Sequence, residues 1–330
     1  MKTTRFLLLL VVSLAVQQAK AIVIDTVPVG NVDNTADTRY ETPGYGSVGY
    51  AYNIGKYEVT AGQYTAFLNA VGGVDTYALY NPNMSDTSIG SGIARSGGGI
   101  VGDPYAYAVD ANFVKRPVNF VSYWDATRFA NWLHNNQPSG AQGAGTTETG
   151  AYTLTSDGIN NNTIVRNTNW KWAVTSEDEW YKAAYHDKTA GQAATYFDYP
   201  TSNNTAPGRD MADVSGNNAN YYGTPYPIDS PYYTTLVGEF QNSDSPYGTF
   251  DQGGNVWEWN EAILYSSSRG LRGGGWGNDS DYLLASYRND RNPTSESNGI
   301  GFRVASIPEP GSLTLCVAGV MMLMLWSRRK

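Results

Sequence analysis

Residues 253–276 form the most restrictive stretch of this chain. Gly-Gly-Asn-Val-Trp-Glu-Trp occupies residues 253–259, and Leu-Arg-Gly-Gly-Gly-Trp occupies residues 271–276. Tryptophan rings need a buried surface to pack against, whereas glycine lets a backbone turn tightly and approach other groups closely. A carboxylate and an arginine in the same stretch need partners if they are buried. The block therefore predicts a constrained turn in the core, beside a possible ion site.

The composition favours an irregular, aromatic-rich domain over a helical bundle. The 330 residues include 36 Gly, 25 Tyr and 9 Trp, and only 16% of the residues are charged. The chain can still bury a sizeable core, because 41% of its residues are hydrophobic. It has no repeated period and no clean linker, so one domain is the simplest count.

Both ends of the chain have the composition of export signals. Residues 1–21 combine two basic residues, an apolar run and Ala19-Lys20-Ala21, which is the pattern of a secretory signal peptide, and we expect cleavage after Ala21. Residues 311–326 form a second apolar run, which is short for a membrane span, and a basic cluster follows it. The physics of this run fits either a plain anchor helix or a processed sorting tail.

Pro308-Glu309-Pro310 stands before the second apolar run, and these features together resemble the PEP-CTERM sorting signal. The resemblance implies that an exosortase-type membrane protease removes the tail, and that the protein is exported to the cell surface or extracellular matrix. We therefore expect a signal peptide at 1–21, one folded domain at 22–306 and a sorting tail with a short transmembrane segment at 307–330. Membrane contact is expected only through this tail.

The folded domain is strongly acidic and contains no cysteine. The two ends hold six of the 22 basic residues and one of the 30 acidic residues, so 16 basic and 29 acidic residues remain, a net charge of −13. This charge argues against nucleic acid or an anionic membrane as a partner and is compatible with calcium. Cys316 is the only cysteine and lies in the apolar tail, so the domain has no disulfide, thiolate nucleophile or cysteine-bound metal.

The spacing of apolar residues predicts three short helices. The first is expected at 61–71 with Thr60 as its N-cap, and the second follows Ser122. The third follows Thr175 or Ser176 and has three acidic residues in its first turn, where carboxylates suit the helix dipole.

A short strand is expected before each of these helices, at 57–60, 116–121 and 170–174. The stretches 81–110 and 137–150 have the composition of loops. Beyond the third helix we expect strands, turns and aromatic-rich loops, and no helix of any length. Few short helices, short strands and long structured loops indicate an α+β fold.

Six blocks, in order along residues 25–305, resemble the formylglycine-generating enzyme (sulfatase-modifying factor) family. The blocks are 55–60, 116–119 with 124–126, 175–180, 254–259, 272–276 and 301–303. The resemblance implies a single domain with a C-type-lectin-like fold.

The same resemblance indicates that the family's chemistry is absent. Enzymes of the family use copper held by two cysteines to oxidise a substrate cysteine to formylglycine, and soft thiolates are the ligands that select Cu(I). Asn278 and Leu283 stand at those two positions here, and Gly275 replaces a serine of the motif. We therefore expect no copper and assign no catalytic residue.

Calcium is the cofactor that the resemblance does imply, in a structural role, because the family holds two calcium ions with oxygen ligands. The first site corresponds to the side chains of Asp251 and Glu258 and the carbonyls of Gly254 and Val256. The second corresponds to the side chains of Asn220 and Asp229 and the carbonyls of Tyr221 and Pro231. An alternative is that Asp251 and Glu258 cap turns or pair with Arg272 or Arg288. Arg272 and Arg303 are in turn expected to pair with Glu58 or Glu258.

A ligand groove is expected between Asn278 and Arg291, with Tyr282 and Arg288 as further contacts. Arginine and aromatic side chains together suit a carboxylate, a sugar or a peptide. The leading hypothesis is thus an exported, non-catalytic binding module for a glycan, a peptide or a matrix polymer. Two alternatives stay open: a divergent sulfatase-modifying-factor enzyme and a structural scaffold without a small ligand.

Overall fold

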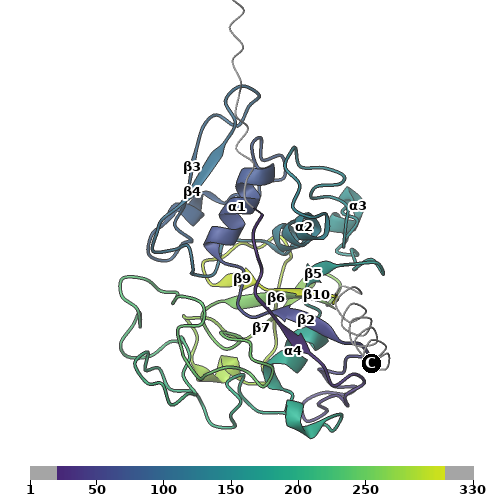
Figure 1. Cartoon of the computed structure of the whole chain (residues 1–330), viewed down its shortest axis with the longest axis vertical. Helices are drawn as coiled ribbons and strands as arrows, with labels where there is room; N and C mark the ends of the chain where they lie inside the picture. The colour runs from purple at the N-terminus through teal and green to yellow at the C-terminus, as the bar shows by residue number, and fades with distance from the viewer. Residues whose placement is uncertain (1–20, 309–330) are drawn as a thin grey trace, which may run out of the picture.

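The structure is a computed structural model that describes residues 21–308, and within them it holds three small sheets, four helices and much irregular chain (Figure 1). The expected signal peptide lies outside these residues except for Ala21, and the expected tail lies outside them from residue 309 onward. No helix within residues 21–308 is long and apolar enough to cross a membrane. The helices are α1 (Ala61–Val71), α2 (Tyr123–His134), α3 (Ser156–Asn160) and α4 (Glu177–Tyr185), with 3₁₀ turns at Pro82–Ser85, Lys188–Ala190 and Ser280–Leu283.

The last strand of the domain lies inside the first sheet. That sheet has the order β1 (Thr26–Val29), β2 (Tyr52–Gly55), β10 (Val304–Ser306) and β5 (Trp172–Val174), and all its pairs are antiparallel. The chain therefore ends its fold between strands that come from much earlier in the sequence.

The second sheet carries the block at 253–276. Its order is β8 (Asn289–Arg291), β7 (Ser268–Arg272), β6 (Trp257–Leu264) and β9 (Ile300–Phe302), with β6 and β9 parallel. The remaining sheet is a hairpin of β3 (Ile93–Ser96) and β4 (Ala106–Val109). Helices α1 and α2 lie on one side of the central strands and α4 lies on the other (Figure 1).

All three predicted helices are confirmed, including their starts. α1, α2 and α4 each begin with a capping box. In each box the N-cap hydroxyl accepts a hydrogen bond from the backbone N–H of the third helical residue, and the side chain of that residue accepts one from the backbone N–H of the N-cap. The N-caps are Thr60, Ser122 and Ser176, so Ser176 rather than Thr175 starts the third helix. The acidic first turn of α4 is confirmed as well.

The predicted strands at 57–60 and 116–121 are wrong. β2 ends at Gly55, and only an isolated bridge between Thr60 and Pro117 remains of the second strand. The reason is visible at Asn119, whose side-chain NH₂ donates to the carbonyls of Ile89 and Asn298 at 2.8 and 2.6 Å. This buried amide binds neighbouring loops to the segment, which has no strand ladder.

The loop expected at 81–110 contains the β3–β4 hairpin, and α3 was not expected either. The hairpin buries Ile93 and Tyr107 against α1, and the Tyr107 hydroxyl donates to the carbonyl of Gly72 at 2.9 Å. Its short alternating pattern is hidden in a glycine-rich stretch. The predicted loop at 137–150 is confirmed.

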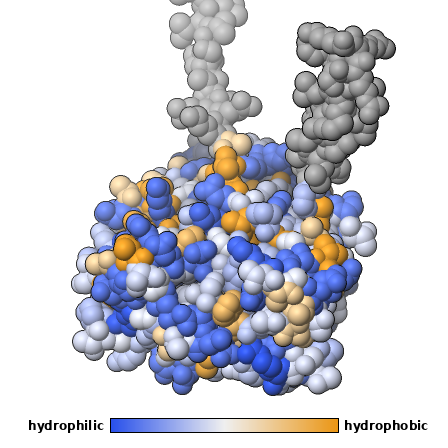
Figure 2. All heavy atoms as spheres, turned by 60° about the horizontal axis from the view of Figure 1, so that its bottom comes forward, coloured by the Kyte–Doolittle hydropathy of each residue, from blue (hydrophilic) through white to orange (hydrophobic). Residues whose placement is uncertain are grey.

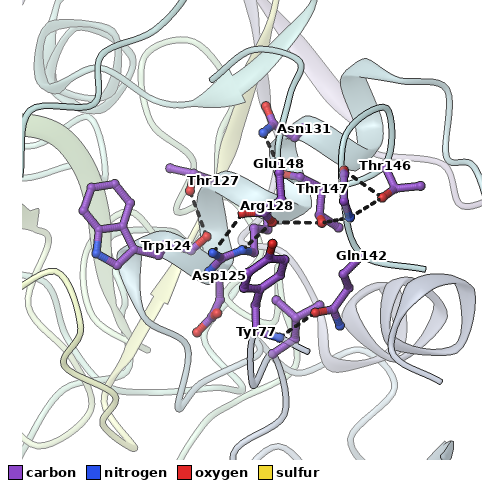
Figure 3. A network of polar contacts seen from close by, with 12 residues as sticks. Tyr77, Trp124, Asp125, Thr127, Arg128, Asn131, Gln142, Thr146, Thr147 and Glu148 are labelled. Carbon is purple, nitrogen blue, oxygen red and sulfur yellow. Dashed lines mark hydrogen bonds and ion pairs between the residues drawn. The ribbon is translucent and has the colours of Figure 1, made fainter. Parts of the chain in front are cut away.

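Buried polar contacts fix that loop to α2 (Figure 3). The guanidinium of Arg128 binds Glu148 through two bonds of 2.8 and 3.1 Å and lies 4.4 Å from the ring centre of Tyr77. Asn131 donates to the carbonyls of Thr147 and Tyr152 at 2.7 and 3.0 Å. These buried hydrogen bonds fix the position of an irregular segment relative to α2.

The surface offers no large apolar patch in the view of Figure 2. Orange groups on that face are small and are separated by hydrophilic residues. Exposed Val101 and Ile100 are at the tip of the β3–β4 hairpin, and exposed Tyr265 is at the turn between β6 and β7. Hydrophobic residues scattered in this way are normal for a protein surface.

The pH dependence of stability should reveal the buried cap of α2. Burial raises the pKa of Asp125 to about 7, and bonds from Ser122 only partly oppose this shift. Because the pKa of the folded state exceeds that of the unfolded state, stability from this group is full below about pH 4 and is lost as the pH rises through about 7. Between pH 5 and 7 the free energy of unfolding should fall relative to that of Asp125→Asn by up to roughly 1.4 kcal/mol per pH unit.

Urea unfolding at each pH measures this difference. Asp157→Asn is the matched control, because Asp157 is an exposed carboxylate in the first turn of α3. A wild-type stability that runs parallel to that of Asp125→Asn across this range would contradict the assignment.

Candidate functional site

The block at 253–276 forms the constrained core turn that its sequence predicts. It enters β6 at Trp257 and leaves β7 at Arg272, and Glu258 lies opposite Arg272 in the ladder. Gly254 has a φ of 86°, and a Cβ on this residue would lie 2.2 Å from the carbonyl oxygen of Asn220. No other residue fits such a position without moving the backbone.

A buried ion pair lies behind this turn. Arg303 binds both oxygens of Glu258 at 2.6 Å, and the indole N–H of Trp180 donates to the same carboxylate at 2.7 Å. Both charged side chains have an exposure of 1% or less. The interpretation that Arg303 is a partner of Glu258 is therefore confirmed. Arg272 instead binds Glu177, at 2.9 Å.

Two more carboxylates belong to this cluster. Glu58 is 2% exposed, and neither of its oxygens has a hydrogen-bond partner within the described residues. Asp251 accepts a bond from the backbone N–H of Gly238 at 2.6 Å. Burial raises the pKa of Glu58, with repulsion from Asp251 and Glu258 adding to the rise, and raises the pKa of Asp251 to about 6.

Three carboxylates thus share one guanidinium, and two negative charges remain. Two bound protons or one divalent cation would neutralise them. No three His, Cys, Asp or Glu side chains between residues 21 and 308 converge as metal ligands, so an ion here would also need backbone oxygens. In that part of the chain no turn or loop N–H donates to the carbonyls of Gly254 or Val256.

These groups fit calcium at the first predicted site. The donors are hard oxygens from carboxylates and carbonyls, as calcium requires, and neither oxygen of the buried Glu58 carboxylate has a hydrogen-bond partner in the described residues. Since both oxygens of Glu258 are engaged by Arg303, Glu58 and Asp251 are the carboxylates with free capacity. Sequence reasoning did not include Glu58 in the predicted site, although a carboxylate inside Tyr-Glu-Val is a signal of burial.

The second predicted site does not fit a cation. Asp229 forms an ion pair with Arg116 at 2.6 Å, and the carbonyl of Tyr221 accepts a bond from Arg209 at 2.7 Å. The side-chain NH₂ of Asn220 donates to the carbonyl of Tyr233 at 2.9 Å. Two of the four expected ligand groups already face guanidinium groups, whose charge would repel an ion. For the carbonyl of Pro231, the family resemblance is the only argument for a role as a ligand.

A cleft of about 190 Å³ opens beside the glycine turn, on the other side of Trp257. Asn278 fixes its floor, because its side-chain oxygen accepts bonds from the indole N–H of Trp257 at 2.8 Å and the backbone N–H of Gly275 at 3.2 Å. The lining residues are Trp257, Leu271, Gly275, Trp276, Gly277, Asn278, Asn289, Arg291, Ser297, Asn298, Gly299 and Ile300.

The two positions expected to replace the copper cysteines lie in different surroundings. Asn278 lines the cleft, whereas Leu283 is fully buried in an apolar cluster with Tyr199 and Ala219. The side chain of Leu283 therefore contributes packing and offers no ligand atom.

Two of the four predicted ligand contacts line the cleft. Asn278 and Arg291 are among its walls, and Tyr282 packs beside them with its ring centre 6.0 Å from that of Trp257. Arg288 does not line it. Its guanidinium binds Glu177, with the Nε bond at 2.8 Å, and lies near Glu41 in a neighbouring hollow.

Strand β8 explains this separation. Successive side chains of a strand point to opposite faces, so Arg291 faces the cleft and Asp290 faces the hollow of Arg288, while Asn289 borders both. Sequence reasoning did not place a strand at 289–291 and therefore missed Asn289. It also missed Asn298, whereas it had placed Trp276 among the aromatic residues that could stack on a sugar or peptide.

The small sheets, capped short helices and long structured loops define a C-type-lectin-like α+β fold. The chain belongs to the FGE-sulfatase family, since its residues 12–307 match the sulfatase-modifying factor enzyme 1-like domain. No curated protein matches this chain.

Two solved structures share this fold over most of their length. Treponema denticola variable protein 1 is 19% identical, with a TM-score of 0.53, and the alignment covers 88% of this chain and 98% of that protein. CarF is 21% identical, with a TM-score of 0.52, and the alignment covers 87% and 99%. At these identities the likeness establishes the fold alone.

Removal of calcium is expected to destabilise the protein through the first site. Free calcium at about 100 times its Kd would raise the free energy of unfolding by about 2.7 kcal/mol. This increase corresponds to a Tm roughly 5–10 °C higher than in EGTA. Calorimetry of the full chain in detergent at pH 7 measures the difference. In Glu58→Gln the difference should shrink, because the orphaned charge is gone.

Glu41→Gln is the matched control, since Glu41 is an exposed carboxylate in the hollow of Arg288. It should keep the full response to calcium. A wild-type Tm that is the same in calcium and in EGTA would rule out a structural ion here.

Proposed function

We propose that this protein is an exported, non-catalytic binding module that takes its ligand in the cleft beside Trp276. The observation that carries the proposal is the chemistry of the cleft walls. They consist of tryptophans, glycines, asparagine amides, a serine, two aliphatic residues and one arginine. The rings of such walls can stack on a ligand, and their polar groups can donate and accept hydrogen bonds, as a binding site requires.

The same walls lack the usual groups of an enzyme site. Within the described residues the cleft holds no cysteine, histidine, aspartate or glutamate, so no activated nucleophile or general base faces a ligand. Ser297 is the only hydroxyl, and its bonds connect it to Asn298 and Gly299 rather than to a base. The chemistry favours binding over turnover.

Calcium and export complete the proposal. The ion would be held near Glu58 and Asp251, where it neutralises buried charge and stabilises the turn that carries the cleft. The signal peptide and the exosortase-type processing of the tail would bring the domain to the cell surface or extracellular matrix. There a glycan, a peptide or a matrix polymer is the available class of ligand.

Filling the cleft should weaken ligand binding without unfolding the protein. A Cβ on Gly299 would meet no atom within 4 Å, so Gly299→Phe can add a ring in the cleft without a clash at its base. We expect the full chain in detergent to bind one or more ligands on an array of immobilised polysaccharides and peptides. Gly299→Phe should weaken that binding roughly tenfold or more, since it removes the contact surface.

Gly143→Phe is the control for the added ring. Gly143 also has open space around its Cβ but lies in the loop beside α2, outside the cleft. Unchanged binding by Gly299→Phe would move the site elsewhere. An array that stays blank for the wild type would favour a scaffold.

Copper gives a separate test of catalysis. Family enzymes need two thiolates, and the chain has only Cys316, which lies outside the described residues. A Cu(I) titration of the full-length Cys316→Ser variant, followed with a competing chelator, should show no stoichiometric binding because no thiolate remains. Tight binding of one Cu(I) per chain would favour a divergent enzyme instead.

A further inference from the structure

A row of aromatic rings begins at the cleft, and three of its four members belong to a different loop. Trp276 forms one wall of the cleft, and its ring centre lies 4.6 Å from that of Tyr233. Tyr226 lies 5.3 Å from Tyr233, and Tyr222 lies 4.8 Å from Tyr226. The contacts form a continuous row of rings, in which Tyr226 meets Tyr222 and Tyr233 edge to face, at 67° and 82°. We call these four residues the aromatic strip.

The outer half of the aromatic strip faces solvent. Tyr222 is 55% exposed and Tyr226 is 41% exposed, whereas Tyr233 and Trp276 are half-buried. Tyrosine at a surface offers a flat, rigid face with a polar edge and loses little conformational entropy on binding. Two exposed neighbouring rings beside a cleft are more than the filling of a core requires.

The aromatic strip is fixed to the floor of the cleft. The backbone N–H of Tyr222 donates to the carbonyl of Asn278 at 2.6 Å, and that of Trp276 donates to the carbonyl of Asn255 at 2.9 Å. The backbone N–H of Asn255 in turn donates to the carbonyl of Asn220, at 2.8 Å. Strip and cleft are therefore held in one fixed arrangement before any ligand arrives, which lowers the entropic cost of binding.

The charge of the cleft is opposite to that of the whole chain. The chain has a net charge of −8, but the only charged lining residue is Arg291. Within residues 21–308 this exposed guanidinium forms no ion pair, and its hydrogen bond goes to the neighbouring carbonyl of Asp290 at 3.2 Å. By contrast, Arg288 is neutralised by Glu177. An unpaired guanidinium at a cleft without carboxylates suits an anionic group.

The asparagine amides supply neutral donors beside that cation. The side-chain oxygens of Asn289 and Asn298 accept bonds from the N–H of Asp290 at 2.9 Å and the hydroxyl of Ser297 at 3.3 Å. Their NH₂ groups stay available to a ligand in the described part of the chain. Amide donors and flat rings together match the hydroxyls and the apolar faces of sugars.

We propose that the ligand is a polysaccharide with sparse carboxylates, which places one acidic sugar at Arg291 and stacks its neighbours along the aromatic strip. This inference rests on the proposed binding function and names its ligand class. A densely charged polymer would be repelled by the acidic domain, so the carboxylates must be separated by neutral sugars. A peptide fits less well, because the cleft of about 190 Å³ has no deep apolar pocket for a side chain.

Gellan is the probe, since it is mostly neutral and carries regularly spaced glucuronates. Carboxyl-reduced gellan is the matched ligand without charge. Binding of the full chain in detergent to each immobilised polymer is measured in calcium. We expect reduction of the carboxylates to weaken binding roughly tenfold or more, as the loss of a charged hydrogen bond does.

Two variants separate the cation from the rings. Arg291→Gln should bind both polymers equally, at the weak level of the reduced polymer. The double variant Tyr222→Ala with Tyr226→Ala should weaken binding to both polymers by about the same factor, roughly threefold to tenfold. Tyr265→Ala, which removes an 85% exposed ring outside the strip, should change neither. Circular dichroism and Tm confirm that each variant folds.

Each outcome decides between specific claims. Equal wild-type binding of gellan and its reduced form overturns the role of the carboxylate, and unchanged binding by the double tyrosine variant overturns the strip. If the wild-type protein does not bind gellan but binds acidic peptides through Arg291, the proposed ligand class is wrong while the binding function stands. If the wild-type protein binds neither polysaccharides nor peptides, both the ligand class and the proposed binding function are wrong.

Discussion

The bidentate pair between Glu258 and Arg303 is the contact on which the rest of the fold depends. Arg303 also donates to the carbonyls of Gly55 and Phe250 at 2.9 Å each, so one guanidinium joins the end of β2, the loop just before the block at 253–276 and β6. A buried pair gains little over apolar packing, but losing one partner costs about 3–5 kcal/mol. The pair therefore favours the arrangement in which both buried charges have partners.

Side-chain amides extend this control into the irregular chain. Asn255 accepts a bond from the N–H of Thr235 at 3.0 Å, while its backbone connects to Asn220 and Trp276. Asn119 and Asn131 bridge other loops in the same way. Backbone groups that a ladder would satisfy are satisfied here by single side chains. The walls of the cleft can then be loops and still hold their positions.

The parts of the fold that were predictable are those whose signals are local. The N-caps at Thr60, Ser122 and Ser176 could be predicted, because the N-cap hydroxyl and the third helical residue of each capping box lie within four positions of the sequence. The glycine turn was readable for the same reason. The strand at 289–291 and the pairing of Arg288 with Glu177 were not, because both depend on residues more than 15 positions away. In the candidate site, Asn278 and Arg291 followed from their place near the motif, whereas the three tyrosines of the aromatic strip come from a loop with no regular pattern.

The position of β10 has a consequence for how such a chain is made. This strand lies between β2 and β5 and comprises residues 304–306, so the first sheet lacks an inner strand until nearly the whole domain has emerged. Arg303, immediately before it, arrives equally late. Contacts between such distant segments form slowly, because a long loop must close first. The core of the domain therefore cannot be completed until residues 303–306 are present, and a chain cut short before them should lack both the inner strand and the partner of Glu258.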